Sequence, residues 1–221
     1  ERTKVAHPSL EEMAFWYDGY IRGHDGVHIY NPASVSKALA SGVCRNYWAG
    51  TGPMNEVQDT IKNNVKDLRE DVIIMTGGKA LNVKLTGFSV EKNQIATRDE
   101  ILSAMVVYGF LTYHEKQLSI PNHELMLKFR QALASKELGL NQTIMESKKL
   151  VRATLDRNHD EVAKQLEELH NEKIPFINYH DENSLACVVT VAYLAALDTY
   201  LIKREDQAGK GYADFTFTPI K

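Results

Sequence analysis

The sequence predicts a mainly helical fold with small β elements, of the α+β class. Apolar residues recur at helical spacing in successive segments, and several of these segments begin at an N-cap signal. The strand candidates between them are short runs that end at glycine or proline. With 43% hydrophobic and 25% charged residues, the composition is that of a globular protein with buried cores.

Charge and cysteine content exclude several classes of protein. A net charge of −3 argues against a surface devoted to wrapping nucleic acid, although it leaves room for a local basic groove. Cys44 and Cys187 are too few for a disulfide framework or a Cys-rich zinc site, and they predict reduced thiols in a cytoplasmic protein. The longest apolar stretch, 185–197, is shorter than the roughly 20 residues of a membrane span. We therefore expect a cytoplasmic protein that does not enter the membrane.

The two ends of the sequence suggest a piece of a longer protein. The chain starts at Glu1 without an initiator Met or a secretory signal. At the other end, the strand-like run 215–218 stops almost at once, at Lys221. We expect a fragment, which the gene sequence on both sides would test.

Helices and short strands are predicted over the first part of the chain. Ser9 and Glu12 form a capping-box pattern, which predicts a helix from residue 10 onward. The pair Asn31-Pro32 is typical of a helix start, and Gly42 is typical of a helix end. Further along, we expect a helix over 54–65 and short strands at 72–74 and 83–85.

A second capping box is followed by a predicted hairpin. Thr97 and Glu100 open a helix that ends at Gly109, and two short runs follow, 110–113 and 117–120. A helix followed by a tight hairpin is typical of a winged-helix module. Such modules bind nucleic acid or serve as protein packing units, and both alternatives stay open. The hairpin offers only Lys116 as a cation that can reach a phosphate.

The rest of the chain is predicted to be helical until its last residues. We expect helices over 123–138, 144–156 and 160–170, one long apolar helix over 182–201, and a strand over 212–218. A shift in composition near residues 130–140 predicts a domain boundary there.

Familiar nucleotide and metal motifs are missing from the sequence. A phosphate-binding loop needs an upstream glycine and a hydroxyl residue after its Lys, and neither Gly78-Lys79 nor Gly209-Lys210 has them. His24, Asp25 and His28 have zinc-like spacing, but they lie in a glycine-rich loop and not on a helix face where they would converge.

Two carboxylates near the C-terminus are candidates for a divalent-metal site. Glu182 starts the predicted long helix, and Asp214 lies in the predicted strand. Mg²⁺ prefers such oxygen ligands and keeps several waters. Each residue also has a structural interpretation, because an acid at a helix N-terminus stabilises the helix dipole and an exposed strand tolerates an Asp.

Eight short blocks of the sequence form a recognisable set. They are FWYDGY at 15–20, IYNPASV at 29–35, NYWAGTG at 46–52, YGFLT at 108–112, IPNHE at 120–124, DEN at 181–183, YLIK at 200–203 and GKGYAD at 209–214. Together these blocks resemble a bacterial family of AAA-ATPase-like proteins that carry a C-terminal PD-(D/E)XK nuclease-like domain. The resemblance covers nearly the whole chain.

The resemblance implies a helical lid and winged-helix-like region over 1–130, followed by a truncated α/β restriction-endonuclease-like domain over 131–221. It implies that Glu182 and Asp214 are the catalytic, Mg²⁺-binding carboxylates. Lys203, Arg204 and Lys210 would contact nucleic acid. ATP would act only through an ATPase module upstream of this chain.

The sequence also departs from the pattern of this family. Tyr212 stands where an Arg is usual, and Ser184-Leu185 replace an aromatic–His pair. The Glu-x-Lys element expected on the next strand is absent, and with it a metal ligand and the Lys that orients the attacking water. We therefore expect this chain to be inactive as a nuclease.

Three functions remain as hypotheses. The first is a part of an ATPase–nuclease protein that acts on nucleic acid, with an incomplete nuclease centre. The alternative is a non-catalytic protein-interaction scaffold whose nuclease-like domain has decayed, which the replacements at Ser184, Leu185 and Tyr212 favour. The third, a DNA-binding winged-helix regulator, is the weakest because the hairpin has few cations.

Overall fold

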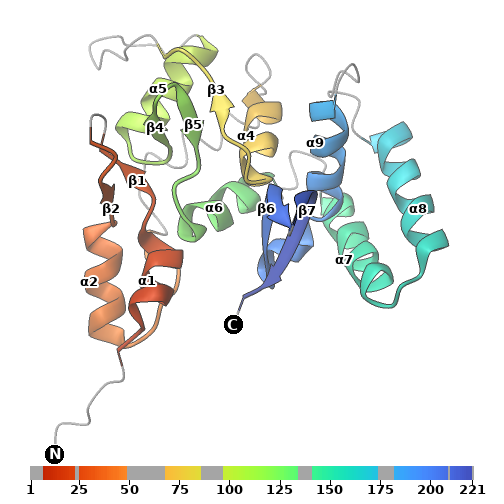
Figure 1. Ribbon diagram of the computed structural model, residues 1–221, viewed down its shortest axis with the longest axis horizontal. Coiled ribbons are helices and arrows are strands. Elements are labelled where there is room, and N and C mark those ends of the chain that lie inside the picture. The colour runs from red at the N-terminus through yellow and green to blue at the C-terminus, as the bar shows by residue number, and fades with distance from the viewer. Residues whose placement is uncertain are drawn as a thin grey trace, which may run out of the picture. The chain divides into compact units, whose positions relative to one another are not determined.

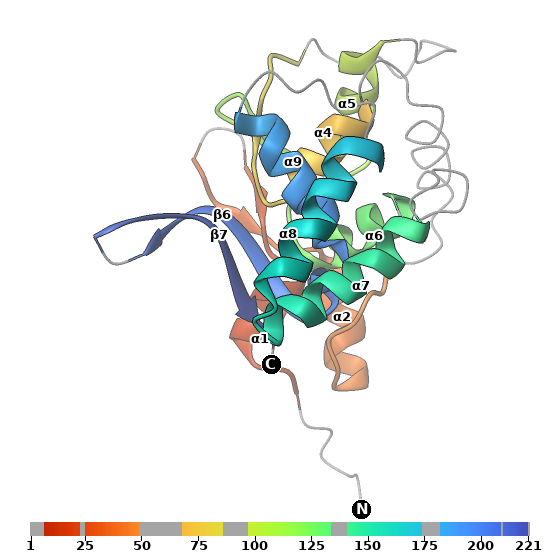
Figure 2. The same cartoon turned by 90° about the vertical axis from the view of Figure 1, so that its right-hand side faces the viewer.

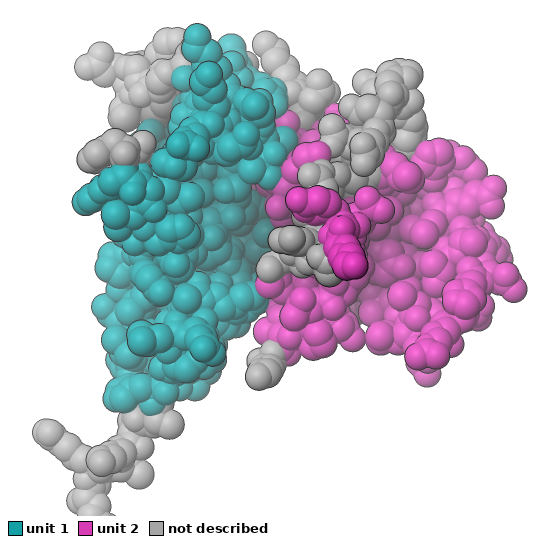
Figure 3. Space-filling view, viewed as in Figure 1, with its two compact units in different colours: residues 1–60, 80–128 teal, residues 61–79, 129–221 magenta. Residues whose placement is uncertain are grey.

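The computed structural model describes residues 7–22, 25–48, 68–85, 97–133, 141–173, 182–208 and 210–220, without the side chains of some residues in α7, η3, α9, η4 and β6. It is a mixture of helices and small antiparallel sheets, as the α+β class predicts (Figure 1). The chain forms two compact units. Unit 1 contains residues 1–60 and 80–128, and unit 2 contains 61–79 and 129–221 (Figure 3).

The first half of unit 1 consists of two capped helices with a small hairpin between them. The elements are α1 (Leu10–Tyr17), β1 (Tyr20–Ile21), β2 (His28–Ile29) and α2 (Pro32–Ser41). The Ser9 side chain accepts a hydrogen bond from the backbone N of Glu12, and Asn31 caps α2 in the same way. Gly42 ends α2 in the left-handed conformation, with φ of 74°. The predicted starts of both helices and the end of α2 are confirmed.

The second half of unit 1 contains a helix and a three-stranded sheet. The elements are β3 (Leu81–Asn82), α5 (Arg98–Val107), β4 (Thr112–His114) and β5 (Gln117–Ser119), and the strand order is β3-β5-β4. Thr97 and Glu100 form the predicted reciprocal capping box. The tight turn of the hairpin has positive φ at both Glu115 and Lys116, which suits the twist of the flanking strands. The predicted hairpin is confirmed.

Unit 2 is a group of helices with one long hairpin. Helix α6 (His123–Leu133) begins in unit 1 and ends in unit 2. The hairpin is antiparallel, and in Figure 1 helix α7 lies between it and α8. Figure 2 shows the hairpin extending away from the helices of this unit. The other elements are α4 (Leu68–Thr76), α7 (Asn141–Leu155), α8 (His159–Glu168), the π-helical turn η3 (Leu169–Lys173), α9 (Glu182–Ala192), the 3₁₀ turn η4 (Leu194–Asp198), β6 (Tyr200–Ala208) and β7 (Gly211–Pro219).

The predicted strand at 72–74 is wrong, because this segment is part of α4. Leu68, Val72 and Met75 are buried at helical spacing, and α4 packs against α9. β-Branched residues favour strands locally, but burial of a helical face overrides this weak preference. The strand predicted at 83–85 is also misplaced, because β3 covers only Leu81–Asn82 and residues 83–85 lie outside it. Val83 N still donates one hydrogen bond to Lys116 O at 2.9 Å.

The single long helix predicted over 182–201 is also wrong. Helix α9 ends at Ala192, η4 follows, and Tyr200 already belongs to β6. The continuous apolar run correctly indicates that the segment is buried, since residues 191–197 are all buried. It has no periodicity, however, and therefore cannot show where the helix ends and where the turn and the strand begin. The strand predicted at 212–218 is confirmed by β7. The helix predicted over 54–65 lies outside the described residues.

Candidate functional site

The two predicted metal ligands lie on different elements of unit 2. Glu182 is the first residue of α9, and its side chain is outside the described part of the structure. Asp214 is in the middle of β7 and is exposed. Among the side chains that the structure describes, no three His, Cys, Asp or Glu residues are grouped so that they could hold a metal ion.

The three predicted nucleic-acid contacts occupy different places on the hairpin. The strand register pairs Lys203 with Thr216 and Arg204 with Phe215. Since successive strand positions alternate between faces, only the Lys203 position shares the face of Asp214. Lys210 is exposed in the turn that joins β6 to β7.

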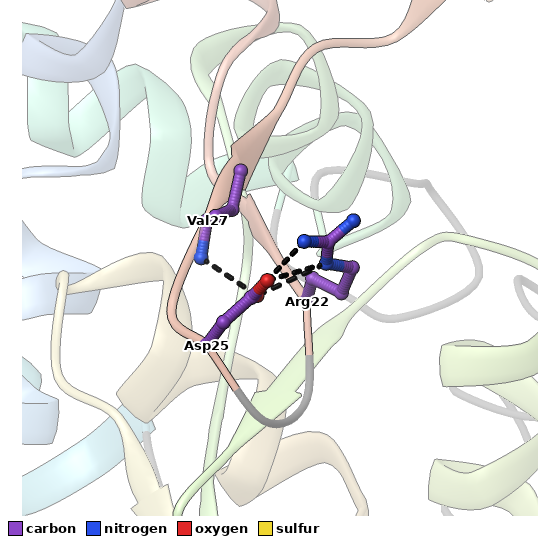
Figure 4. A network of polar contacts seen from close by, with 3 residues as sticks. All are labelled: Arg22, Asp25 and Val27. Carbon is purple, nitrogen blue, oxygen red and sulfur yellow. Dashed lines mark hydrogen bonds and ion pairs between the residues drawn. The ribbon is translucent and has the colours of Figure 1, made fainter.

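The zinc-like residues of the sequence bind other protein groups. Asp25 accepts hydrogen bonds from the Arg22 guanidinium, with Nε 3.0 Å from Oδ1, and from Val27 N at 3.3 Å (Figure 4). The Arg22 guanidinium holds the pKa of Asp25 below its usual value. The Nδ1 atom of His28 lies 3.2 Å from Asp18 Oδ2. These contacts support the β1–β2 hairpin, and His24 is outside the described residues.

Unit 1 contains a buried carboxylate that the sequence analysis did not single out. Glu124, in the first turn of α6, has no exposed surface. Its Oε2 accepts a hydrogen bond from Ser34 Oγ at 2.8 Å, and its Oε1 accepts from the backbone N atoms of Tyr47 at 2.6 Å and Trp48 at 2.8 Å. We call Glu124 with these three residues the Glu124 centre. Three donors and the N-terminal end of a helix compensate for the loss of water around the charge.

Aromatic residues from the FWYDGY block surround the start of α6. The His123 ring stacks on Phe15 with centroids 4.4 Å apart and meets Trp16 edge-on at 4.7 Å. The Tyr17 hydroxyl donates to Arg45 O and accepts from Arg45 N, both at 2.9 Å. Burial raises the pKa of Tyr17 above its ordinary value.

The next residues of the same block touch the β-hairpin region. The Tyr20 hydroxyl donates to Gly109 O at 2.7 Å, and burial is the main cause of the raised pKa of Tyr20, followed by the charge of Glu124. Gly19 has φ of 120°, and a Cβ there would lie 1.8 Å from Pro121 O. Only glycine permits this approach.

Residues from all five blocks of unit 1 therefore meet around the Glu124 centre. The carboxylate is fully enclosed and its hydrogen bonds are made within the protein, so it has no access to a substrate. The arrangement holds two helices and the hairpin region together. The only local signal in the sequence is an acid in the first turn of a helix, which does not distinguish a buried Glu from an exposed one.

Unit 2 contains an open recess between α7, η4 and the hairpin, with a volume of about 210 Å³. We call it the aromatic recess. Its lining is almost wholly apolar. The lining residues are Val151, Thr154, Leu155, Tyr193, Ala196, Tyr200 and Phe217.

Comparisons with known proteins add no family to these observations. No family model, curated protein or solved structure matches the chain. In the described part of the chain, no helix combines the length and apolar character needed to cross a membrane.

Proposed function

We propose that this chain is part of an ATPase–nuclease-like protein that acts on nucleic acid, and that Glu182 and Asp214 are its Mg²⁺ ligands. One observation carries the proposal. Glu182 opens α9, and the chain then forms the β6–β7 hairpin with Asp214 exposed on its second strand. This order of helix carboxylate and strand carboxylate agrees with the resemblance to the nuclease-like domain. ATP would act only through an ATPase module outside this chain.

The donor chemistry is compatible with Mg²⁺ but not with a complete nuclease centre. Mg²⁺ is bound by one or two carboxylates and keeps several waters, and Asp214 is an accessible oxygen ligand of this kind. The bound ion would neutralise the charge of a phosphate. Residues 215–221 contain no Glu-x-Lys pattern, the element that in such a centre supplies a further metal ligand and a Lys that orients a water. We propose binding of Mg²⁺ and nucleic acid without cleavage by this chain.

Calorimetric titration with MgCl₂ tests the metal ligands. The wild type is expected to give a binding heat that Asp214→Asn loses. Asp156→Asn is a matched control, because it removes another exposed carboxylate of unit 2 at a position outside the candidate site. Equal heats for wild type and Asp214→Asn would contradict the metal site. Cleavage of plasmid or single-stranded DNA by the purified chain with Mg²⁺ would contradict the absence of nuclease activity.

A second function, a protein-interaction scaffold, is favoured by the burial of α5. Its residues 101–105 are all buried, and five consecutive helical positions cover the whole circumference of a helix. No solvent-facing side is left there to read a DNA groove. The hairpin after α5 offers only Lys116 for phosphate contact.

Binding of duplex DNA to the isolated chain separates the scaffold from a winged-helix regulator. If the winged-helix-like region is a scaffold, we expect no steeply salt-dependent binding of duplex DNA, and we expect Lys116→Ala to leave duplex binding unchanged. Salt-dependent duplex binding that is lost in Lys116→Ala would favour the regulator instead.

A further inference from the structure

We propose that the aromatic recess of unit 2 binds one unstacked base of a single-stranded nucleic acid, while cations on α7 hold the neighbouring phosphates. The inference rests on the proposed function in one respect, namely that the partner is nucleic acid. It adds a contact that the predicted site residues do not include.

The size and the walls of the recess fit a single base. An apolar cavity of about 150 Å³ holds a benzene ring, so a volume of about 210 Å³ has room for a larger flat ring. Three aromatic side chains line it, with the rings of Tyr193 and Phe217 5.1 Å apart and those of Tyr200 and Phe217 6.5 Å apart. Every base has a π-face, and aromatic walls stabilise it by stacking whatever its sequence.

Two of the hydroxyl groups that line the recess, those of Thr154 and Tyr193, are already engaged. Thr154 Oγ1 donates to Leu150 O at 2.8 Å, so the hydrogen bond of 2.8 Å between Thr154 and Tyr193 uses the Tyr193 proton. Neither hydroxyl has a proton left for a ligand. A bound base would stack and turn its polar edge to the open mouth, where Leu155 and Phe217 are exposed. We therefore expect binding with little preference among bases.

Two cations flank the recess on the exposed side of α7. Lys148 and Arg152 are one helical turn apart, beside the lining residues Val151 and Leu155, and both are exposed. Arg152 lies 3.9 Å from Asp156, and an ion pair this exposed is weak enough to be exchanged for a phosphate. Aromatic walls beside cations are the combination that binds single strands.

The distribution of charge in unit 2 also restricts where a strand can run. Helix α8 carries acidic residues and packs against α7. Its carboxylates repel phosphates, so they disfavour a path of the strand over α8. The acidic residues are Asp160, Glu161, Glu167 and Glu168.

The recess and the predicted metal ligands can be tested separately. Phe217 and Asp214 are three positions apart on β7, and alternation places them on opposite faces of the hairpin. A substitution on one face leaves the other face unchanged.

The test measures fluorescence anisotropy of a labelled dT12 oligonucleotide with the full chain, without metal, at low salt. Leu155→Glu places a negative charge at the mouth of the recess, and we expect it to weaken binding at least tenfold. Met145→Glu is the matched control, because it is on the same helix with the same exposed fraction of 62% but does not line the recess. We expect a change of less than threefold for the control.

Further variants separate the contribution of base stacking from the contribution of phosphate contacts to dT12 binding. Phe217→Ala is expected to weaken dT12 binding at least fivefold by loss of stacking. Arg152→Gln is expected to reduce the slope of log affinity against log salt by about 0.7 for one lost phosphate contact. A 12-mer of abasic sites is expected to bind at least fivefold more weakly than dT12. If Phe217→Ala does not fold, Leu155→Glu still tests the recess, because Leu155 is exposed and its replacement is not expected to prevent folding.

Several results would overturn the proposal. These are no dT12 binding by the wild type, equal affinities for Leu155→Glu and Met145→Glu, or equal affinities for dT12 and the abasic strand. Binding of an acidic, Phe-containing peptide without dT12 binding would also overturn it, in favour of a protein partner. If the recess fails while Asp214→Asn abolishes the Mg²⁺ heat, the metal proposal stands alone.

Discussion

The two units use their polar and aromatic side chains in opposite ways. In unit 1, Glu124 and Tyr17 are buried and hydrogen-bonded within the protein, and the hydroxyl of the half-buried Tyr20 is hydrogen-bonded to Gly109 O. In unit 2, aromatic rings line an open recess beside exposed cations on α7. Unit 1 contains most of the blocks that carry the family resemblance, yet its polar groups are already satisfied by one another. A dense motif can therefore specify packing, while groups that are open to a ligand lie elsewhere.

The comparison implies that substitutions in unit 1 reduce stability, whereas those around the recess reduce binding. Unit 1 can be followed by itself, because both tryptophans of the chain, Trp16 and Trp48, belong to it. Urea unfolding monitored by tryptophan fluorescence therefore reports on unit 1.

The largest effect is expected for Gly19→Ala. Its backbone has φ of 120°, and the new Cβ would lie 1.8 Å from Pro121 O, a backbone atom that cannot move alone. We expect a loss of about 4 kcal/mol in the free energy of unfolding of unit 1. Gly26→Ala is the control, with positive φ but open space around the new Cβ, and is expected to cost about 1 kcal/mol. Similar losses for both would contradict the close contact at Gly19.

A smaller loss is expected for Glu124→Gln. The amide has one acceptor oxygen in place of two, so Ser34 Oγ or the backbone N atoms of Tyr47 and Trp48 lose their acceptor in a buried place. We expect unit 1 to lose about 3 kcal/mol in urea unfolding. Glu115→Gln makes the same change at an exposed turn and is expected to leave stability within about 0.5 kcal/mol.

Alkaline pH should also act on unit 1. Burial raises the pKa of Tyr17 and Tyr20 in the folded state, so their contribution to stability is complete below the unfolded value of about 10 and is lost as pH rises above it. We expect the tryptophan signal to report unfolding in that range, together with tyrosinate absorbance at 295 nm. Tyr17→Phe should shift the transition to higher pH. Tyr212→Phe should not, because that ring is 80% exposed.

The smallest effect on stability is expected for Leu155→Glu, although it should abolish most oligonucleotide binding. The side chain is largely exposed, so its replacement removes little buried area. We expect the thermal unfolding midpoint, measured by circular dichroism, to stay within about 2 °C of the wild type. A large decrease would show that the residue is part of the core of unit 2 and would weaken the contrast between the units.

Helix caps were the most predictable features of the fold. Ser9, Asn31 and Thr97 each bond the backbone N atoms expected of an N-cap, and Gly42 ends its helix in the left-handed conformation. These signals act over three or four residues, so the local sequence contains all of the information. The hairpin of β4 and β5 was predictable for the same reason.

Apolar runs without periodicity were not predictable. Residues 72–74 form a helix because they pack against α9, and the run 185–197 is interrupted by η4 because the chain turns there toward β6. The candidate sites show the same limit. Glu182 and Asp214 were visible as carboxylates beside structural signals, but the aromatic recess combines residues of α7, η4, β6 and β7 that have no local pattern in common.

The sequence by itself determined the class of the fold, the starts of its capped helices, the turns at glycine and the positions of its candidate metal ligands. Only the tertiary structure decided that Glu124 is buried with three donors, that Asp214 is exposed, and that three aromatic rings meet beside the cations of α7. The physical reason is the distance along the chain over which the interactions act. Caps and turns depend on neighbours in the chain, whereas burial and the chemistry of a site depend on residues brought together from distant segments.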